Sequence, residues 1–139
     1  MPDISSHAQY SFSEPLPPQC PPANAVDAAY PKALRLVDAS KVDEVCEKEF
    51  LSYAALGNSR PNVDPCAFAS CSLFESETCK GFKAALKLPK LRGKKIAEIS
   101  IPQGSGLSTR SSSGHIHFWR FIGFDPIPFV KEVREHANS

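Results

Sequence analysis

The sequence predicts an α+β fold: a single domain in which a mixed sheet of about four strands carries three packed helices. Apolar and polar residues alternate in residues 32–38 and 96–101, as they do in half-buried strands. Apolar residues recur at helical spacing in residues 40–56 and 77–88. With 139 residues, 42% of them hydrophobic, the chain is long enough to bury the core of one domain.

Residues 1–27 differ in composition from the rest and predict a proline-rich arm, separate from the single α+β domain of residues 28–139. The arm holds six prolines and no lysine or arginine. Proline fixes φ and removes a backbone donor, so neither a helix nor a central strand runs through this segment. Tyr10, Phe12 and Leu16 are the expected anchors on the domain. The spacing of Pro15 and Pro18 leaves open a second role, as a polyproline ligand for a protein partner.

The first half of the domain predicts a strand, a helix and a second strand. Residues 32–38 form the first strand. Ser40 begins a helix with a capping box completed by Asp43, and Gly57 ends it. Residues 57–65 are a turn-forming loop, and residues 70–74 form a short buried strand. The expected buried stripe of this helix comprises Val42, Cys46, Phe50, Tyr53 and Ala54.

The second half predicts a helix, two strands and a last helix. Ser76 caps a helix that Pro89 ends, and a strand follows at residues 96–101. A polar loop over residues 102–114 leads into residues 115–122, which are apolar on both faces and therefore predict a central strand. Pro128 is expected at the first position of a short final helix.

Composition and length predict a cytoplasmic protein without a membrane span. No apolar run approaches the roughly 18–20 residues that a spanning helix needs, and the N-terminal residues lack a basic flank and an apolar segment. In the cytoplasm the five cysteines, an odd number, are expected to be reduced. The formal net charge of +1 gives no general reason for binding nucleic acid or membrane. The basic stretch 80–95 is typical of a solvated helix face.

His115 and His117 form the one His-x-His pair of the chain. Residues two apart on a strand point to the same side, so the two imidazoles are expected to lie together. Such a pair can act in acid–base catalysis, contact a ligand or coordinate a metal ion. The alternative is that both histidines are purely structural residues of the strand. A metal needs a further ligand, and the spacing of the cysteines matches no zinc motif, so we assign no metal.

The loop before the histidines is the second candidate. Its glycines and serines allow backbone N–H groups to turn toward an anion, and Arg110, beside Ser111, adds a guanidinium. The loop lacks the phosphate-binding P-loop pattern, and the alternative is a flexible connection between neighbouring strands. Cys71 is a further candidate, as a nucleophile with a histidine as its base.

Four segments together, ALRLV, SLFES, IAEI and STRSSSGHIHFW, resemble a group of small uncharacterised bacterial proteins over about residues 30–130. This resemblance implies no known activity. The layout is also similar to that of ADP-ribosyltransferase-like domains, which place an Arg or His on the first strand, a Ser on the second and a Glu late in the chain. Arg35 and Ser72 fill the first two positions. His115, His117 and Arg120 stand in place of the Glu, a departure that counts against NAD transfer.

These observations lead to one functional hypothesis and one alternative. The hypothesis is a site for a small anionic ligand, with the reaction and any cofactor left unassigned. His115, His117 and Ser72 are its candidate catalytic residues, and Arg110, Ser111 and Arg35 its candidate ligand-binding residues. The alternative is a non-enzymatic interaction module that contacts a protein partner through the arm and the basic surface 80–95.

Overall fold

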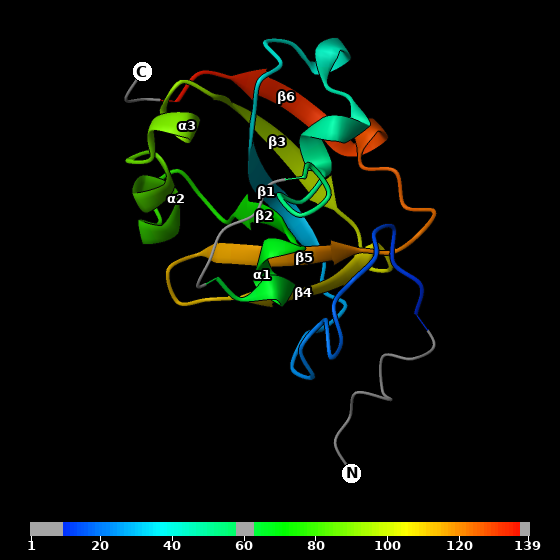
Figure 1. The fold of residues 1–139 in the computed structure, drawn as a ribbon. Helices are drawn as coiled ribbons and strands as arrows, with labels where there is room; N and C mark the ends of the chain where they lie inside the picture. The colour runs from blue at the N-terminus through cyan, green and yellow to red at the C-terminus, as the bar shows by residue number, and fades with distance from the viewer. Residues whose placement is uncertain (1–9, 58–62, 137–139) are drawn as a thin grey trace.

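The computed structural model describes residues 10–57 and 63–136, and in this part of the chain six antiparallel strands form one sheet. The strand order is β4-β5-β2-β1-β3-β6 (Figure 1). The predicted α+β class is confirmed, with six strands instead of about four and with antiparallel instead of mixed pairing. The strands are β1 (Tyr30–Val37), β2 (Cys71–Phe74), β3 (Lys95–Ile101), β4 (Gly106–Arg110), β5 (His115–Arg120) and β6 (Val130–Arg134).

The described helices are short, and the longest, α2, has six residues. Three are α-helices, α1 (Pro65–Phe68), α2 (Lys80–Ala85) and α3 (Pro89–Arg92), and three are 3-10 turns, η2 (Val42–Glu44), η3 (Glu47–Phe50) and η4 (Ile127–Phe129). One face of the sheet packs on Val45 and Phe50 from the η2–η3 segment. The opposite face packs on Phe82 and neighbouring residues of α2. Both faces are therefore covered, but by different and separate segments.

The sheet consists of two halves that meet at a single residue pair. β1 and β2 are paired at Leu34 and Phe74, whereas β2 pairs with β5, and β1 with β3, along most of their lengths. Between the halves the Arg35 Nη1 group donates to the Ser72 carbonyl oxygen at 2.9 Å. A side-chain hydrogen bond thus joins the two strands where the backbone ladder is missing.

The predicted helix over residues 40–56 is wrong. The segment forms η2 and η3 instead, and Cys46, placed in the expected buried stripe, is exposed. Carbonyl groups that a helix would bond internally are used by Arg35: its Nε donates to the Glu49 oxygen at 2.9 Å and its Nη2 to the Leu51 oxygen at 3.3 Å. This long-range competition is invisible to a local pattern.

Three further expectations in the second half need correction. The helix of residues 77–88 is interrupted: Cys79 rather than Ser76 caps α2, and Pro89 opens α3 instead of closing a single helix. Residues 106–110, expected as part of a loop, form β4. The expected final helix is wrong, because Pro128 belongs to η4 and the chain continues as β6 on the free edge of β3.

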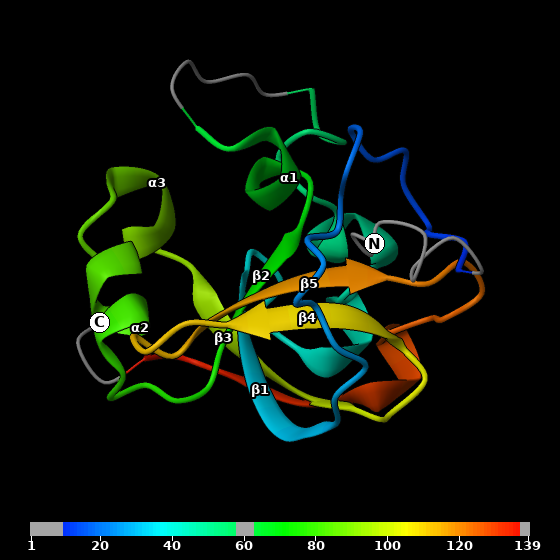
Figure 2. The same ribbon diagram turned by 90° about the horizontal axis from the view of Figure 1, so that it is seen from below.

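The described part of the N-terminal arm, residues 10–27, lies along β4 and β5 (Figure 2). Tyr10 stacks on Phe121, with ring centroids 4.7 Å apart, and Val26 bridges to Ser108. The Glu14 carboxylate accepts hydrogen bonds from the backbone and hydroxyl of Ser52. Tyr10, Phe12 and Leu16 pack around Trp119 and Leu107, as the sequence predicts.

A disulfide between Cys20 and Cys66 ties the arm to the first turn of α1. The expectation that all cysteines are reduced is therefore wrong for this pair, while Cys46, Cys71 and Cys79 are free thiols. The bridge joins residues 46 positions apart, so it closes a loop that spans the arm, β1 and the η2–η3 segment.

Replacing Cys20 and Cys66 together by alanine should lower the free energy of unfolding by about 2–4 kcal/mol, because the unfolded chain gains the freedom of an open loop. Urea denaturation followed by circular dichroism measures the change. Cys46→Ala, at an exposed free thiol, is the matched control and should leave the midpoint unchanged. Equal midpoints for the double variant and the native chain would contradict this account of the arm.

Candidate functional site

Two cavities lie beside the row of residues that crosses the sheet through Ser72, His117 and Thr109. These three residues are direct partners in the registers of β2 with β5 and of β5 with β4. Since partners in adjacent strands share one face, their side chains form a continuous row. We call the two spaces the Arg35 cavity and the arm cavity.

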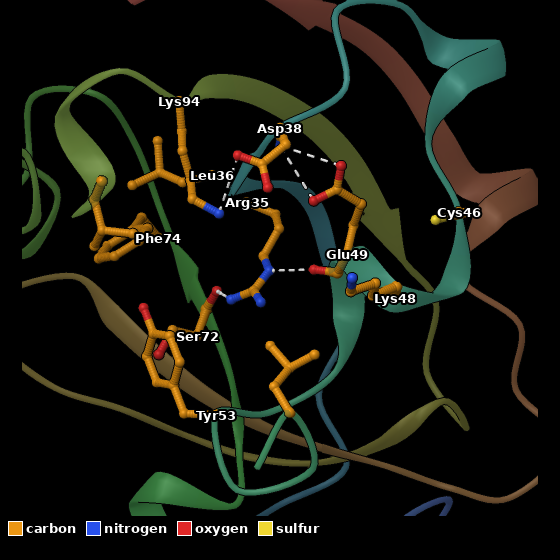
Figure 3. A pocket seen from close by; sticks show the side chains of 12 residues that line it. Arg35, Leu36, Asp38, Cys46, Lys48, Glu49, Tyr53, Ser72, Phe74 and Lys94 are labelled. Carbon is orange, nitrogen blue, oxygen red and sulfur yellow. Dashed lines mark hydrogen bonds and ion pairs between the residues drawn. The ribbon is translucent and has the colours of Figure 1, made fainter. Parts of the chain in front are cut away.

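The Arg35 cavity, of about 290 Å³, lies where β1 and β2 diverge (Figure 3). β1 supplies Arg35, β2 supplies Ser72 and Phe74, and the η2–η3 segment with the following turn supplies the opposite wall. Its complete lining is Arg35, Leu36, Asp38, Cys46, Lys48, Glu49, Tyr53, Leu56, Ser72, Phe74, Leu91 and Lys94.

The Arg35 guanidinium is held by three carbonyl oxygens, those of Glu49, Leu51 and Ser72. Of its five N–H donors, these bonds use one on each nitrogen, so one on each Nη remains for another acceptor. Within residues 10–57 and 63–136 no carboxylate forms an ion pair with it. Its positive charge is therefore fixed in place and not neutralised by a neighbouring acid.

The carboxylates at the rim of this cavity already have partners. Asp38 pairs with Lys94 at 3.4 Å, and the Glu49 carboxylate accepts hydrogen bonds from the backbone N–H groups of Asp38 and Ala39 at 2.9–3.1 Å. Lys48 is exposed on the same rim. The lining thus contains three cationic side chains and two engaged carboxylates, which favours an anion near Arg35.

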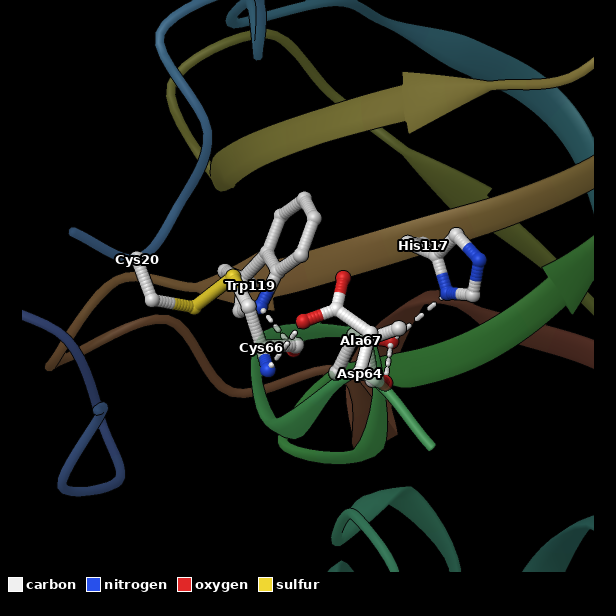
Figure 4. The surroundings of a disulfide bond; sticks show 7 residues. Cys20, Asp64, Cys66, Ala67, His117 and Trp119 are labelled. Carbon is white, nitrogen blue, oxygen red and sulfur yellow. Dashed lines mark hydrogen bonds between the residues drawn. A yellow bond between two sulfur atoms is a disulfide. The ribbon is translucent and has the colours of Figure 1, made fainter. Parts of the chain in front are cut away.

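The arm cavity, of about 450 Å³, lies between the N-terminal arm and the face of β4 and β5. Figure 4 shows the Cys20–Cys66 bridge beside Trp119, with Asp64 between Trp119 and His117. The Trp119 Nε1–H donates to the Cys66 carbonyl oxygen at 3.0 Å, which fixes the indole against α1. The lining is Pro17, Pro18, Gln19, Pro22, Asp64, Pro65, Cys66, Ala67, Thr109, His117 and Trp119.

The two histidines do lie together on one side of β5, as their spacing predicts. Their ring centroids are 4.4 Å apart. His115 stacks on Phe74, with centroids 5.1 Å apart and an interplanar angle of 16°. Its Nε2 is buried and has no hydrogen-bond partner in the described structure. Burial, with a smaller contribution from His117, lowers the pKa of His115 to about 4.

His117 lines the arm cavity and is held in one tautomer by Ser70. The Ser70 hydroxyl donates its one proton to the Ala67 carbonyl oxygen at 2.6 Å. It must therefore accept from His117 Nδ1–H, which lies 2.9 Å away, and Nε2 is left with a lone pair. Burial lowers the pKa of His117, and the nearby Asp64 charge opposes this shift only in part. The ring is neutral at pH 7.

Arg110 and Ser111 lie beside β5: the Ser111 N–H donates to the His115 carbonyl oxygen at 3.0 Å, and Arg110 is the register partner of Ile116. Arg110 ends β4 and pairs with the Glu75 carboxylate, and the Ser111 hydroxyl is 2.7 Å from that of Ser113 in the turn between β4 and β5. Neither residue lines the Arg35 cavity or the arm cavity. The structure thus brings Arg35 to Ser72 and His117 to Ser72, whereas the Arg110 side chain lies on the face of its register partner Ile116, opposite the histidine side chains.

Cys71 and Arg120 have structural surroundings. Burial raises the pKa of the Cys71 thiol, which keeps it protonated and disfavours a role as nucleophile. Arg120 is buried, donates to the Phe124 carbonyl oxygen at 3.0 Å and pairs with Glu47 at 3.3 Å. In the described residues no group of three or more His, Cys, Asp or Glu side chains is arranged to hold a metal.

Sequence reasoning missed Asp64 and Lys94, which line the cavities, and Ser70, which contacts His117. The dipeptide Asp64-Pro65 is an N-cap followed by proline at the first helical position, so it signals the start of α1. No local pattern indicates that this cap lies opposite His117. Ser70 and Lys94 likewise acquire their positions only through strand pairing.

Comparison of the chain with protein-family models, curated proteins and solved structures found no match. Within the described part of the chain, no helix has the length and apolar character required to cross a membrane.

The low pKa of His115 should make the protein less stable as the pH falls from about 6.5 toward 4. The unfolded chain binds a proton in this window and the folded chain does not, so protonation favours unfolding. Allowing for the solvent that reaches the half-buried ring, about 1 kcal/mol should be lost. His115→Phe keeps the stack on Phe74 and removes the titration. Urea unfolding at several pH values gives the free energy of unfolding as a function of pH, and its slope between pH 6.5 and 4 should be shallower for this variant than for the native chain. Equal slopes would contradict a low pKa for His115.

Ser70→Ala should release the tautomer of His117, because the acceptor for Nδ1–H is lost. Long-range ¹H–¹⁵N correlation spectra should show a protonated Nδ1 in the native chain and a mixture of tautomers in the variant. Ser76→Ala, at a serine distant from His117, is the control. A native spectrum with the proton on Nε2 would refute the geometry described above.

Proposed function

We propose that the protein binds a small phosphate-bearing ligand in the Arg35 cavity, with Arg35 as the central anion-binding group. The observation that carries the proposal is the fixed guanidinium, which has three carbonyl partners and no ion-pairing carboxylate among the described residues. Arginine recognises phosphate and carboxylate through paired N–H groups. Its two remaining terminal donors supply that recognition.

The other lining groups support an anion with a polar body. Lys48 and Lys94 add positive charge at the rim, and Ser72 lines the cavity beside Arg35. Leu36, Phe74 and Leu91 offer apolar contact for a ring or a sugar face. A volume of about 290 Å³ is at the lower end for small-molecule sites, so it suits a ligand of mononucleotide size or smaller.

The resemblance to ADP-ribosyltransferase-like domains makes a nucleoside diphosphate the favoured ligand class. That layout places an Arg or His on the first strand and a Ser on the second, and here the Arg35 Nη1 group lies 2.9 Å from the Ser72 carbonyl oxygen. The Glu of that layout has no equivalent on β5, whose sequence is HIHFWR. The proposal is therefore binding of a nucleotide-type anion, without NAD transfer.

His117 is the group best placed to act on such a ligand. It does not line the Arg35 cavity, but it is the direct register partner of Ser72, so a ligand that extends past Ser72 reaches the imidazole. A neutral ring with one fixed tautomer suits hydrogen bonding or proton transfer. His115 supports His117 by packing beside it, and Arg110 and Ser111 are not part of the proposed site.

The alternative, an interaction module that uses the arm, has less support. The described arm is tied down by the disulfide, by Glu14 and by the Val26 bridge to Ser108, so it is not a free peptide ligand. The same disulfide favours an oxidising compartment over the cytoplasm, since such bonds persist where thiols are not kept reduced.

ADP and pyrophosphate should bind the native chain, whereas adenosine, which lacks phosphate, should bind far more weakly. Arg35→Lys retains the charge but loses the planar fork, and should weaken ADP binding by about tenfold or more. Lys94→Gln should weaken it by up to about fivefold. Isothermal titration calorimetry at two salt concentrations measures these changes, and binding should decrease at the higher concentration.

Lys80→Gln is the matched control, because Lys80 is exposed on α2 and lines neither cavity. Circular dichroism establishes that each variant folds, and Lys94→Gln tests the site even if Arg35→Lys does not fold. Adenosine binding as tightly as ADP, or equal losses in Lys94→Gln and Lys80→Gln, would overturn the proposal.

A further inference from the structure

The arm cavity differs from the Arg35 cavity in charge. Among the described residues that line it, Asp64 carries the one formal charge at neutral pH, since the His117 ring is neutral. The remaining walls are mostly apolar: prolines from the arm, Pro65 and Trp119. A cavity of about 450 Å³ is within the range of small-molecule sites. The arm cavity is thus a mostly apolar pocket whose one charged residue, among the described lining, is Asp64.

The Asp64 carboxylate is held in position by α1. One oxygen accepts the Cys66 N–H at 3.1 Å, which makes Asp64 the N-cap of that helix. Figure 4 shows the carboxylate aimed at the space between Trp119 and His117. Within residues 10–57 and 63–136, Asp64 has no Lys or Arg partner. Among the described residues no donor bonds the second oxygen, so a donor that enters the cavity can do so.

The walls are formed before any ligand enters. The disulfide joins Cys20 of the arm to Cys66 of α1, so the two sides of the cavity are covalently linked. The paired backbone bonds between Val26 and Ser108, at 2.8–2.9 Å, and the Glu14–Ser52 contact hold the arm on either side of that bridge. A preformed cavity lowers the entropy cost of binding.

From this charge complementarity we propose that the arm cavity binds a cation on an apolar stem: an alkylguanidinium or alkylammonium group, of the kind that an arginine or lysine side chain presents. Asp64 is its counter-ion, and the proline and Trp119 surfaces contact the stem. The apolar part of such a ligand gains by leaving water, while its cationic head keeps a charged hydrogen-bond partner. This site is independent of the anion site proposed above.

The test uses n-butylguanidinium as the probe and n-butylurea, of similar shape but uncharged, as its control ligand. Trp119 is the single tryptophan of the chain and lines the cavity, so its fluorescence reports occupancy directly. The guanidinium compound should bind at millimolar concentration, and n-butylurea should bind at least about tenfold more weakly. The affinity for the cation should fall as the salt concentration rises.

Asp64→Asn is the decisive variant, because the asparagine side-chain oxygen can still accept the Cys66 N–H and cap α1. It should weaken n-butylguanidinium binding by about tenfold and leave the fold intact by circular dichroism. Asp43→Asn removes an exposed carboxylate that lines neither cavity, and should leave this binding unchanged.

The proposal fails if n-butylguanidinium produces no change in Trp119 fluorescence, if n-butylurea binds as tightly, or if Asp64→Asn binds within twofold of the native chain. Because ADP and n-butylguanidinium are measured separately, loss of one binding activity without the other identifies which site is wrong.

Discussion

Arg35 joins the two halves of the sheet, and the rest of the structure depends on that junction. β1 and β2 share one backbone pair, so most of the polar groups that face each other across the gap cannot satisfy one another. The guanidinium reaches from β1 to the carbonyl of Ser72 on β2, to that of Glu49 within η3 and to that of Leu51 just after it. One side chain thus bonds three segments that are distant in sequence. The bonds that hold the halves together also fix the charge at the cavity between them.

The way the sheet is covered explains why the site lies in this place. On the face that carries the row of Ser72, His117 and Thr109, α2 covers one end around Phe74 and Phe82. The arm covers the other end around Leu107 and Trp119. Neither cover extends over the middle of the row, and its polar residues lie there. Polar groups that are buried need hydrogen-bond partners. Because the middle of the row lies between the two apolar clusters, solvent or a ligand can reach its polar residues and supply those partners.

The parts of the fold that were predictable depend on local pattern. The strands predicted at 32–38 and 96–101 correspond to β1 and β3, because the pleat imposes an alternation that is read directly from the sequence, and the strand predicted at 115–122 from its two apolar faces corresponds to β5. Residues 40–56 were misread because a genuine helical spacing lost to long-range bonds from Arg35 to the carbonyls of Glu49 and Leu51. Residues 106–110 were misread because a glycine such as Gly106 suggests a loop. Here Gly106 instead allows β4 to lie close to β5, since a Cβ at this position would collide with the Trp119 carbonyl oxygen.

In the candidate site, too, the features set by local spacing were predictable and those set by long-range contacts were not. The proximity of His115 and His117 follows from their spacing and was predictable. The proximity of Arg35 to Ser72 was suggested only by resemblance, since 37 positions separate them. The position of Asp64 opposite His117 had no signal at all, because it results from α1 lying over β5 and from the disulfide that secures it.

His117 lines the arm cavity and is the register partner of Ser72, which lines the Arg35 cavity, so it stands between the two. A charged imidazolium would offset the Asp64 carboxylate and extend positive potential across the row. Burial lowers the pKa of the ring and so prevents this at neutral pH, while Ser70 orders the neutral tautomer. The contrast between an anion-attracting cavity and a cation-attracting one comes from Arg35, Lys48 and Lys94 in one lining and Asp64 in the other, and the burial of His117 preserves it.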